Sequence, residues 1–291
     1  MSFSVYLRAA ALFALLTGFL LLVGFIVGYY FLGAPVFDVL FFMLFISVVM
    51  NLISYYFGPS MVLRLSGARL AQPGELTQVR SMLESLAQSE NIPVPKLGVA
   101  DQPQPNAFTT GRGKNDAIVV VTTGLLRTMN ENELMAVLGH EVGHIVHRDT
   151  AMATAASTLA TAVTYLADLV LFSLFFGGGS RRGGAGAGIF AVILAPFAAT
   201  MIQLALSRGR EYYADEEAAK LSRPEYLVSA LEKIENYIRR GVPINAPQTT
   251  SSLWISNPFR GSFSDLFSTH PATEKRIKRL REISRKAGYY Y

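Results

Sequence analysis

The chain has 291 residues, of which 51% are hydrophobic and only 16% are charged, and its net charge is +5. Because soluble domains carry about 25% charged residues, this composition indicates a protein partly surrounded by lipid, and the positive charge favours an anionic membrane surface over a nucleic acid as its partner. The absence of cysteine excludes a disulfide scaffold, a cysteine zinc finger, an iron–sulfur site and a thiol nucleophile.

Two uncharged stretches near the amino terminus, residues 9–37 and 39–63, predict membrane helices. Each exceeds the roughly 20 apolar residues that a helix needs to span the hydrocarbon layer. A Gly-Ala-Pro sequence between them predicts a tight turn, so we expect residues 1–64 to form a transmembrane hairpin. One arginine precedes this hairpin and others follow it, and the positive-inside rule therefore places both of its ends in the cytoplasm.

A second pair of apolar stretches, residues 151–176 and 188–206, predicts another hydrophobic hairpin over residues 151–206. The Gly-rich loop between the two stretches contains Arg181 and Arg182. If the hairpin crosses the membrane, these arginines emerge on the far side, against the positive-inside rule. The alternative is a hairpin that packs on the domain formed by the rest of the chain or lies only partly in lipid.

The remaining segments, residues 65–150 and 207–291, predict a domain of helices with a small β-sheet. We expect an amphipathic helix at residues 74–88, two helices that begin near Ser222 and Pro271, and three short strands at Lys96–Ala100, Ala107–Thr110 and 117–122. The last two strands are joined by a Gly-Arg-Gly-Lys-Asn-Asp turn, which predicts a hairpin. The basic side chains of the last helix, Arg276 among them, are expected to form a solvated face or to contact anionic lipid headgroups.

The most informative segment is a His-Glu-Val-Gly-His sequence on a predicted helix. Asn130 and Glu133 predict a capping box at the start of this helix, and its apolar residues predict that it is buried. Histidines four residues apart lie one above the other on a helix, so His140 and His144 can bind one Zn²⁺. Glu141 then lies beside the metal and can take a proton from a metal-activated water.

A catalytic zinc needs a third protein ligand. The metzincin position, six residues after His144, is occupied by Thr150, which excludes that class. His147 lies on the same helical stripe but too far along the axis to join the metal. The segment after the last hydrophobic stretch supplies a carboxylate, Glu211, as the third ligand, and Asp215 one turn later as the acceptor for the free ring N–H of a metal-binding histidine. His144 and Glu211 can bind the same metal only if both lie on the same side of the membrane. The segments between them must therefore cross the membrane twice or not at all.

These motifs, in this order, resemble the HtpX family of membrane-bound zinc metalloproteases of bacteria and archaea, which is related to the CAAX prenyl endopeptidases. The resemblance covers nearly the whole chain: the first hydrophobic hairpin, HEVGH, the second hydrophobic pair, SRGREYYAD and STHPATEKRI. It implies one zinc per subunit on His140, His144 and Glu211, with Glu141 as the catalytic residue.

The resemblance also implies a role and a location. We expect a multi-pass protein of the cell membrane, with a cytoplasmic active site that cleaves misfolded or membrane polypeptides in protein quality control. The expected fold is mostly α with a small β-sheet (α+β), in which integral membrane helices join a zincin-like catalytic domain. The expected parts are residues 1–64, 65–150, 151–206 and 207–291, of which the second and fourth form the catalytic domain.

A donor to the oxyanion of the reaction is the least defined part of the site. Similarity to the family implies that His270 approaches the zinc, where an imidazole can stabilise the oxyanion. A helix-capping role for His270 is the alternative. Tyr212 or Tyr213 can also supply a donor, and the sequence does not choose among the three residues.

The strand that contains Asn106, Ala107 and Phe108 is the candidate substrate-binding element. It is predicted to lie at an edge of the sheet, where an extended polypeptide can add through main-chain hydrogen bonds. An ordinary hairpin strand without a binding role is the alternative.

Two other function classes fit parts of the sequence. A catalytically silent scaffold could keep zinc for folding, but a structural site has no need of Glu141. A metal transporter should carry its ligands within the membrane segments, yet these contain no histidine and only Asp38 and Asp168 as carboxylates. The sequence therefore favours the protease.

Overall fold

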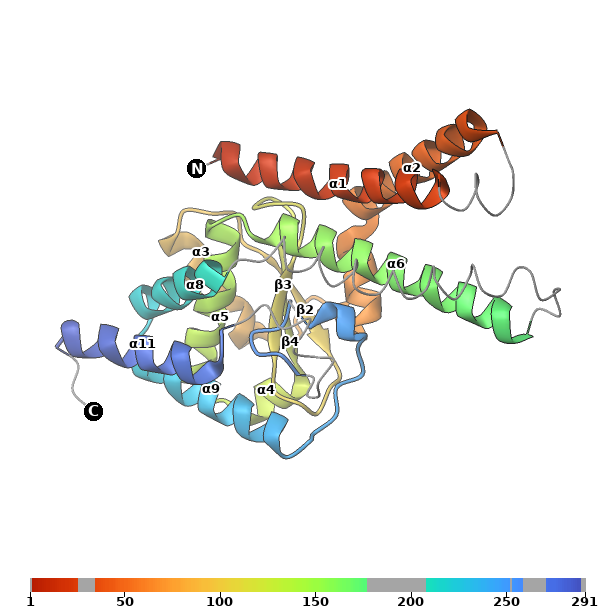
Figure 1. Cartoon of the computed structure of the whole chain (residues 1–291). Helices are drawn as coiled ribbons and strands as arrows, with labels where there is room; N and C mark the ends of the chain where they lie inside the picture. The colour runs from red at the N-terminus through yellow and green to blue at the C-terminus, as the bar shows by residue number, and fades with distance from the viewer. Residues whose placement is uncertain (1, 26–34, 177–207, 252, 259–270, 289–291) are drawn as a thin grey trace. The chain divides into compact units, whose positions relative to one another are not determined.

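A computed structural model describes residues 2–25, 35–176, 208–251, 253–258 and 271–288 (Figure 1). The chain divides into two compact units, one formed by Met1–Gly58 and Ala155–Ala205 and the other by Pro59–Thr154 and Leu206–Tyr291. The turn expected between the first two apolar stretches, the Gly-rich loop and the stretch at 188–206 lie almost entirely outside the described residues. The expected transmembrane role of each segment stays a prediction.

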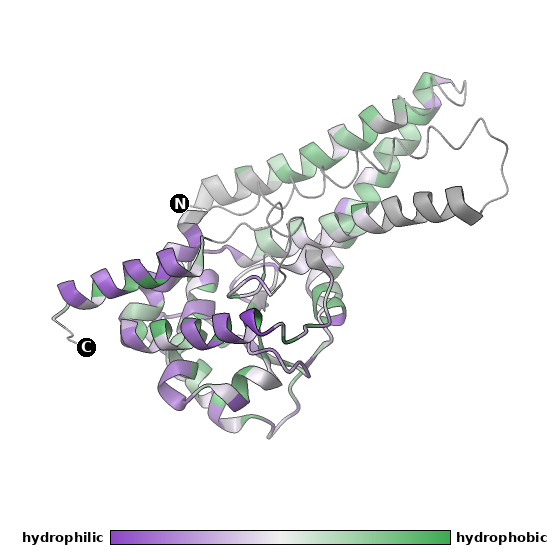
Figure 2. Ribbon diagram, turned by 60° about the horizontal axis from the view of Figure 1, so that its bottom comes forward, coloured by the Kyte–Doolittle hydropathy of each residue, from purple (hydrophilic) through white to green (hydrophobic). Residues whose placement is uncertain are grey.

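The first unit contains the most apolar helices, α1 (Ser2–Phe25), most of α2 (Val36–Leu65) and most of α6 (Thr150–Phe176). Among the described residues, one helix, α2, is long and apolar enough to cross a membrane. Its large apolar side chains are exposed, including Phe37, Phe41 and Phe45. So many exposed large apolar side chains are unusual on a soluble monomer and suit contact with lipid. The green parts of the ribbon in Figure 2 mark the hydrophobic residues.

The second unit contains a four-stranded sheet of order β1-β2-β4-β3. Its strands are β1 (Ala68–Leu70), β2 (Lys96–Ala100), β3 (Ala107–Thr110) and β4 (Ile118–Thr122). The parallel pair β2–β4 lies at the centre, and antiparallel strands flank it on both sides. The hairpin predicted between β3 and β4 is confirmed, whereas β1, with only three residues, carries no periodic signal that the sequence could have revealed.

The described part of this unit also contains α3 (Thr77–Ser89), α4 (Thr123–Thr128), α5 (Glu131–Val146), α8 (Arg208–Leu221), α9 (Pro224–Arg239), the short 3₁₀ turn η2 (Gln248–Thr250) and α11 (Thr273–Lys286). Helix α3 begins at Thr77, later than the predicted residue 74. Leu76, with φ 52°, adopts a left-handed conformation that a helix cannot continue through. Ser222 closes α8 through its hydroxyl instead of capping α9.

Helix α5 lies at the centre of the second unit, between the sheet and the helices α3, α8 and α9 (Figure 1). The predicted capping box is confirmed: Asn130 and Glu133 exchange hydrogen bonds of 2.9 Å between side chain and main chain. The Glu133 carboxylate also accepts bonds from Ser229 at 2.6 Å and Lys233 at 2.7 Å, both on α9. The start of α5 is therefore fixed to its own first turn and to a neighbouring helix.

Small residues allow α5 and α8 to approach closely. Gly139 and Gly143 face Ala218 and Ala214 across the interface. A Cβ atom on Gly143 would lie 3.0 Å from the Cα of Ala214 and 3.1 Å from the Cβ of Glu217, and one on Gly139 would lie 3.4 Å from the Cα of Ala218. Because the distance between helix axes follows the size of the side chains between them, these glycines determine how near α8 comes to α5.

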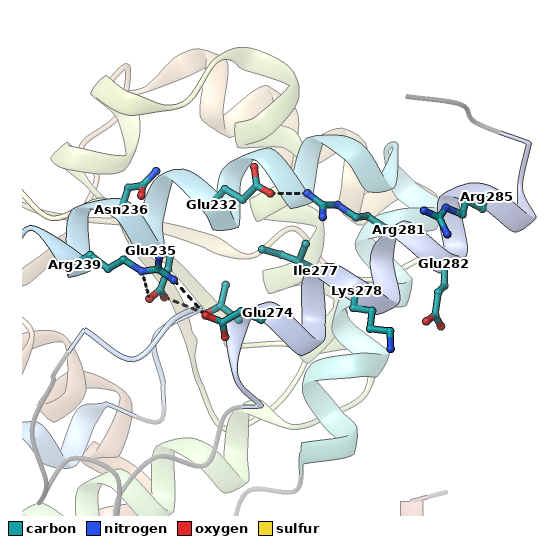
Figure 3. A pocket seen from close by; sticks show the side chains of 11 residues that line it. Glu232, Glu235, Asn236, Arg239, Glu274, Ile277, Lys278, Arg281, Glu282 and Arg285 are labelled. Carbon is teal, nitrogen blue, oxygen red and sulfur yellow. Dashed lines mark hydrogen bonds and ion pairs between the residues drawn. The ribbon is translucent and has the colours of Figure 1, made fainter.

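Helix α11 packs on α9 beside a surface groove of about 600 Å³ (Figure 3). Arg281 pairs with Glu232 at 2.8 Å and Arg239 pairs with Glu274 at 3.2 Å, so ion pairs connect the two helices at separate points along the groove. Ile277 lies between these pairs and is partly buried against the core. These contacts fix the position of α11.

We predict that Gly143→Val destabilises the second unit by about 1–3 kcal/mol, because the added carbon atoms must push the α8 backbone away. Gly113→Val is the control, since no atom lies within 4 Å of the Cβ position at Gly113. Thermal and denaturant unfolding of the detergent-solubilised chain measure the difference. Equal stability of the two variants would contradict the close packing of the helices.

Candidate metal centre

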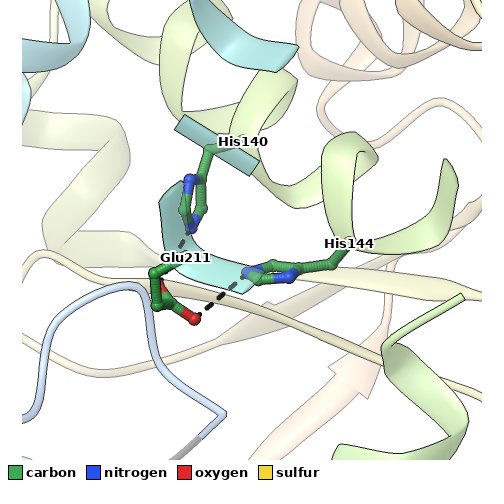
Figure 4. A group of neighbouring side chains, drawn as sticks. All are labelled: His140, His144 and Glu211. Atoms are coloured by element: carbon green, nitrogen blue, oxygen red, sulfur yellow. Dashed lines mark ion pairs between the residues drawn. The ribbon is translucent and has the colours of Figure 1, made fainter. Parts of the chain in front are cut away.

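Three side chains from two helices converge on one point (Figure 4). His140 and His144 lie on α5, and Glu211 lies in the first turn of α8. The Nε2 atoms of the two histidines lie 3.7 Å from Oε2 and Oε1 of Glu211 respectively. The candidate ligand atoms all lie within 4.8 Å of one another. Two imidazole nitrogens and one carboxylate oxygen at such separations fit a single divalent ion with one open position.

Burial and neighbouring charges shift the pKa values of the two histidines in opposite directions. Burial lowers the pKa of His140 to about 4, which keeps this imidazole in the neutral form that binds metals. Burial would also lower the pKa of His144, but the carboxylates of Asp149, Glu211 and Glu141 outweigh it and raise that pKa to about 9. Metal binding at neutral pH therefore has to displace a proton from His144.

An aspartate and an arginine support His140 from behind. The Oδ1 atom of Asp215 lies 3.0 Å from the Nδ1 atom of His140. Arg276 donates two hydrogen bonds to the same carboxylate, from Nε to Oδ2 at 2.9 Å and from Nη2 to Oδ1 at 2.6 Å. Its Nη1 donates to the carbonyl of Ile255 at 2.5 Å and also lies 3.6 Å from Oε2 of Glu211. The expectation that Arg276 belongs to a solvated basic face was wrong: only 1% of the residue is exposed.

Glu141 is buried beside the candidate ligands, with one carboxylate oxygen held and the other available. Its Oε2 atom accepts a hydrogen bond of 2.7 Å from the hydroxyl of Thr109 on β3. Its Oε1 atom has no hydrogen-bond partner in the described part of the chain. Burial raises the pKa of Glu141 to about 7, which is the range in which a side chain exchanges protons best at neutral pH. Sequence reasoning did not identify Thr109 as the partner of this carboxylate.

A small cavity of about 20 Å³ lies on the His144 side of the group. This is enough room for one water-sized group. Its lining includes His144 and Glu211 together with Thr109, Asp149, Thr150, Ala153, Arg210 and Leu253. The cavity therefore connects two candidate ligands with the hydroxyl that holds Glu141.

The other histidine and the tyrosines make different contacts. His147 is the C-cap of α5, and its Nε2 atom lies 3.4 Å from Glu217. The ring of Tyr213 lies 5.7 Å from that of His147, and the ring of Tyr212 lies 4.9 Å from the Arg279 guanidinium. His270 lies outside the described residues, so its approach to the metal stays a prediction.

The expected substrate-binding residues need a correction. Strand β3 is an edge of the sheet, but Asn106, Ala107 and Phe108 are all fully buried. The chain itself covers them: Ile255 N–H donates to Ala107 O at 2.9 Å, Phe108 pairs with Trp254, and the Asn106 amide donates to Ser256 O at 3.0 Å. No free edge exists at these three residues, because the segment 254–256 already occupies it.

We predict that Arg276→Met destabilises the chain by about 3–5 kcal/mol, because it leaves Asp215 as a buried charge without its partner. Arg281→Met is the control, because the pair of Arg281 with Glu232 is about half exposed on both sides and should contribute less than about 1 kcal/mol. Denaturant unfolding measures both. A similar small loss in the two variants would show that Asp215 does not depend on Arg276.

Comparison with known proteins identifies the family. Residues 73–284 match peptidase family M48. A protease HtpX homolog from Pyrococcus abyssi is 43% identical, with 100% of both chains covered, and one from Aquifex aeolicus is 44% identical, with 84% of both chains covered. The crystal structure of S. mikatae Ste24p has a similar fold, with a TM-score of 0.50 and 21% identity over 94% of this chain and 65% of that one. The chain therefore belongs to peptidase family M48, as a metalloendopeptidase of the HtpX type.

Proposed function

We propose that this protein is a zinc-dependent endopeptidase of the cell membrane that hydrolyses misfolded or membrane polypeptides on the cytoplasmic side, in protein quality control. One observation carries the proposal: the group formed by His140, His144 and Glu211 lies directly beside a buried glutamate with an available oxygen. The family supports peptide hydrolysis and a metal, and the nitrogen-rich donor set supports zinc.

The proposed reaction assigns a separate task to each side chain. A zinc ion held by His140, His144 and Glu211 supplies polarisation of the scissile carbonyl and activation of water. Glu141 takes a proton from the attacking water and passes it to the leaving amine, while the Thr109 hydroxyl holds its other oxygen in place. His270 is the proposed donor to the oxyanion.

The membrane assignment is supported by the first unit. Helix α2 exposes a continuous apolar surface and has the length to span a bilayer. By the positive-inside rule, the arginines at the ends of the first hairpin support a cytoplasmic location for those ends and for the catalytic unit. We propose that α1 and the segment from α6 onward complete a multi-pass arrangement.

A zinc-binding scaffold without activity is the second candidate. It would need the three ligands but not a carboxylate beside them. Such a protein has no use for a buried Glu141 with a raised pKa, whose Oε1 oxygen lacks a hydrogen-bond partner among the described residues. The protease is therefore the better account of the site.

We predict that Glu141→Gln lowers the cleavage of an unfolded protein such as casein by at least about 100-fold and leaves zinc bound, because the amide cannot accept the proton of the attacking water. The purified protein in detergent is assayed for cleavage and for metal content side by side. Activity close to wild type would overturn the assignment of Glu141 as the base.

We predict that Glu211→Ala loses both the metal and the activity, because two histidines alone hold zinc weakly. Glu216→Ala is the control, since Glu216 lies on the same helix and pairs with Arg279 at the surface. Metal content after dialysis against a mild chelator separates the two variants. Full zinc occupancy in Glu211→Ala would reject this residue as a ligand.

A further inference from the structure

A second aspartate–arginine pair lies behind the other metal-binding histidine. The Oδ2 atom of Asp149 lies 3.7 Å from the Nδ1 atom of His144. Its second oxygen, Oδ1, lies 3.1 Å from Nε of Arg210. The Nδ1 atom faces away from Glu211, because it is Nε2 of His144 that approaches that ligand. The arrangement repeats the one at His140, where Asp215 and Arg276 occupy the corresponding places.

Both members of this pair are buried and tied closely to the ligands. Asp149 is 8% exposed and Arg210 is 6% exposed. The main-chain N–H of Asp149 donates to the carbonyl of His144 at 2.9 Å, and Arg148, with φ 62°, makes the left-handed turn that brings the aspartate back toward the histidine. Arg210 directly precedes Glu211 in α8. One ion pair thus connects the turn that follows the helix of the histidines to the helix of the carboxylate ligand.

We propose that Asp149 and Arg210 are positioning residues for the metal centre: Asp149 orients the imidazole of His144 through Nδ1, and Arg210 holds Asp149 in place. The inference rests on the proposed metal site. A carboxylate behind a metal-binding histidine fixes the orientation of its ring and increases its basicity. Each histidine then has its own aspartate, and each aspartate has its own arginine from a separate helix.

The charges explain why the arginine is required. A buried carboxylate that has no cation near it is strongly disfavoured. Arg210 is the described cation that pairs with Asp149 at 3.1 Å. Arg210 therefore balances the buried carboxylate and keeps it in position beside the neutral imidazole that binds a metal.

A simpler role for Asp149 has to be separated from this one. The residue directly precedes α6, and its carbonyl accepts the N–H of Ala153, so its side chain occupies the place of a helix N-cap. Serine and asparagine cap helices about as well as aspartate does. Asp149→Ser consequently preserves capping but removes the carboxylate from His144, and Asp149→Asn does the same with a smaller change of volume.

The test is a measurement of metal affinity on the full-length protein in detergent, by competition of the metal-free chain with a chromophoric chelator for Zn²⁺. We expect Asp149→Ser to weaken binding by about 10–100-fold, the usual effect of removing such a partner. Arg210→Gln should weaken binding in the same direction. Because Arg210 acts through Asp149, it should cause no additional loss in the Asp149→Ser background. The visible absorption of the Co²⁺-loaded protein should change in Asp149→Ser, which reports ligand geometry independently of stability.

Glu75→Ser is the control, because it breaks an exposed ion pair with Arg69 at the opposite edge of the sheet. Wild-type affinity and an unchanged Co²⁺ spectrum in Asp149→Ser, or in Asp149→Asn if the serine variant does not fold, would overturn the inference. Additive losses in the double variant would reject the role of Arg210. A wild-type chain that binds no Zn²⁺ would instead refute the proposed metal site, and the inference with it.

Discussion

The close contact between α5 and α8 is the constraint on which the site depends. Two glycines on one helix and two alanines on the other let the backbones touch, and the contact lies one to two turns from Glu211. The carboxylate of Glu211 reaches only a few ångströms beyond its own helix, so a wider spacing would remove it from His140 and His144. Gly143 therefore performs a task that a larger residue could perform only by displacing α8, although it binds nothing itself.

The same contact concentrates charge in a buried region. Glu141, Glu211 and Asp215 are all buried, and Arg276 lies 2.6 Å from Asp215 and 3.6 Å from Glu211. Burying such groups is unfavourable unless each is paired, and the pairing fixes their geometry more than it adds to stability. The arginine comes from α11, which is itself fixed on α9 by its own contacts. In the described part of the chain, the surroundings of the site thus come from α5, α8, α11, the start of α6 and the edge strand β3.

Local chemistry made much of this predictable. The spacing of the histidines, the capping box at Asn130 and the alternation of the strands are encoded within a few residues, and the structure has the corresponding helix and strands where they were expected. Contacts between distant segments were not predictable. Arg276 sits in a strongly basic helix, and only the tertiary position of Asp215 separates it from its solvated neighbours. The covering of β3 by residues 254–256 is equally non-local.

The discontinuous build of the second unit has a consequence for synthesis. The two histidines belong to its first segment, while Glu211, the candidate carboxylate ligand, and Arg276, which holds Asp215, belong to its second segment, after α6. A nascent chain that has emerged only as far as the histidines lacks the carboxylate of Glu211 and the guanidinium of Arg276. Peptidase activity therefore arises late in synthesis, once the intervening apolar segment has been made, and the growing polypeptide is protected from its own activity.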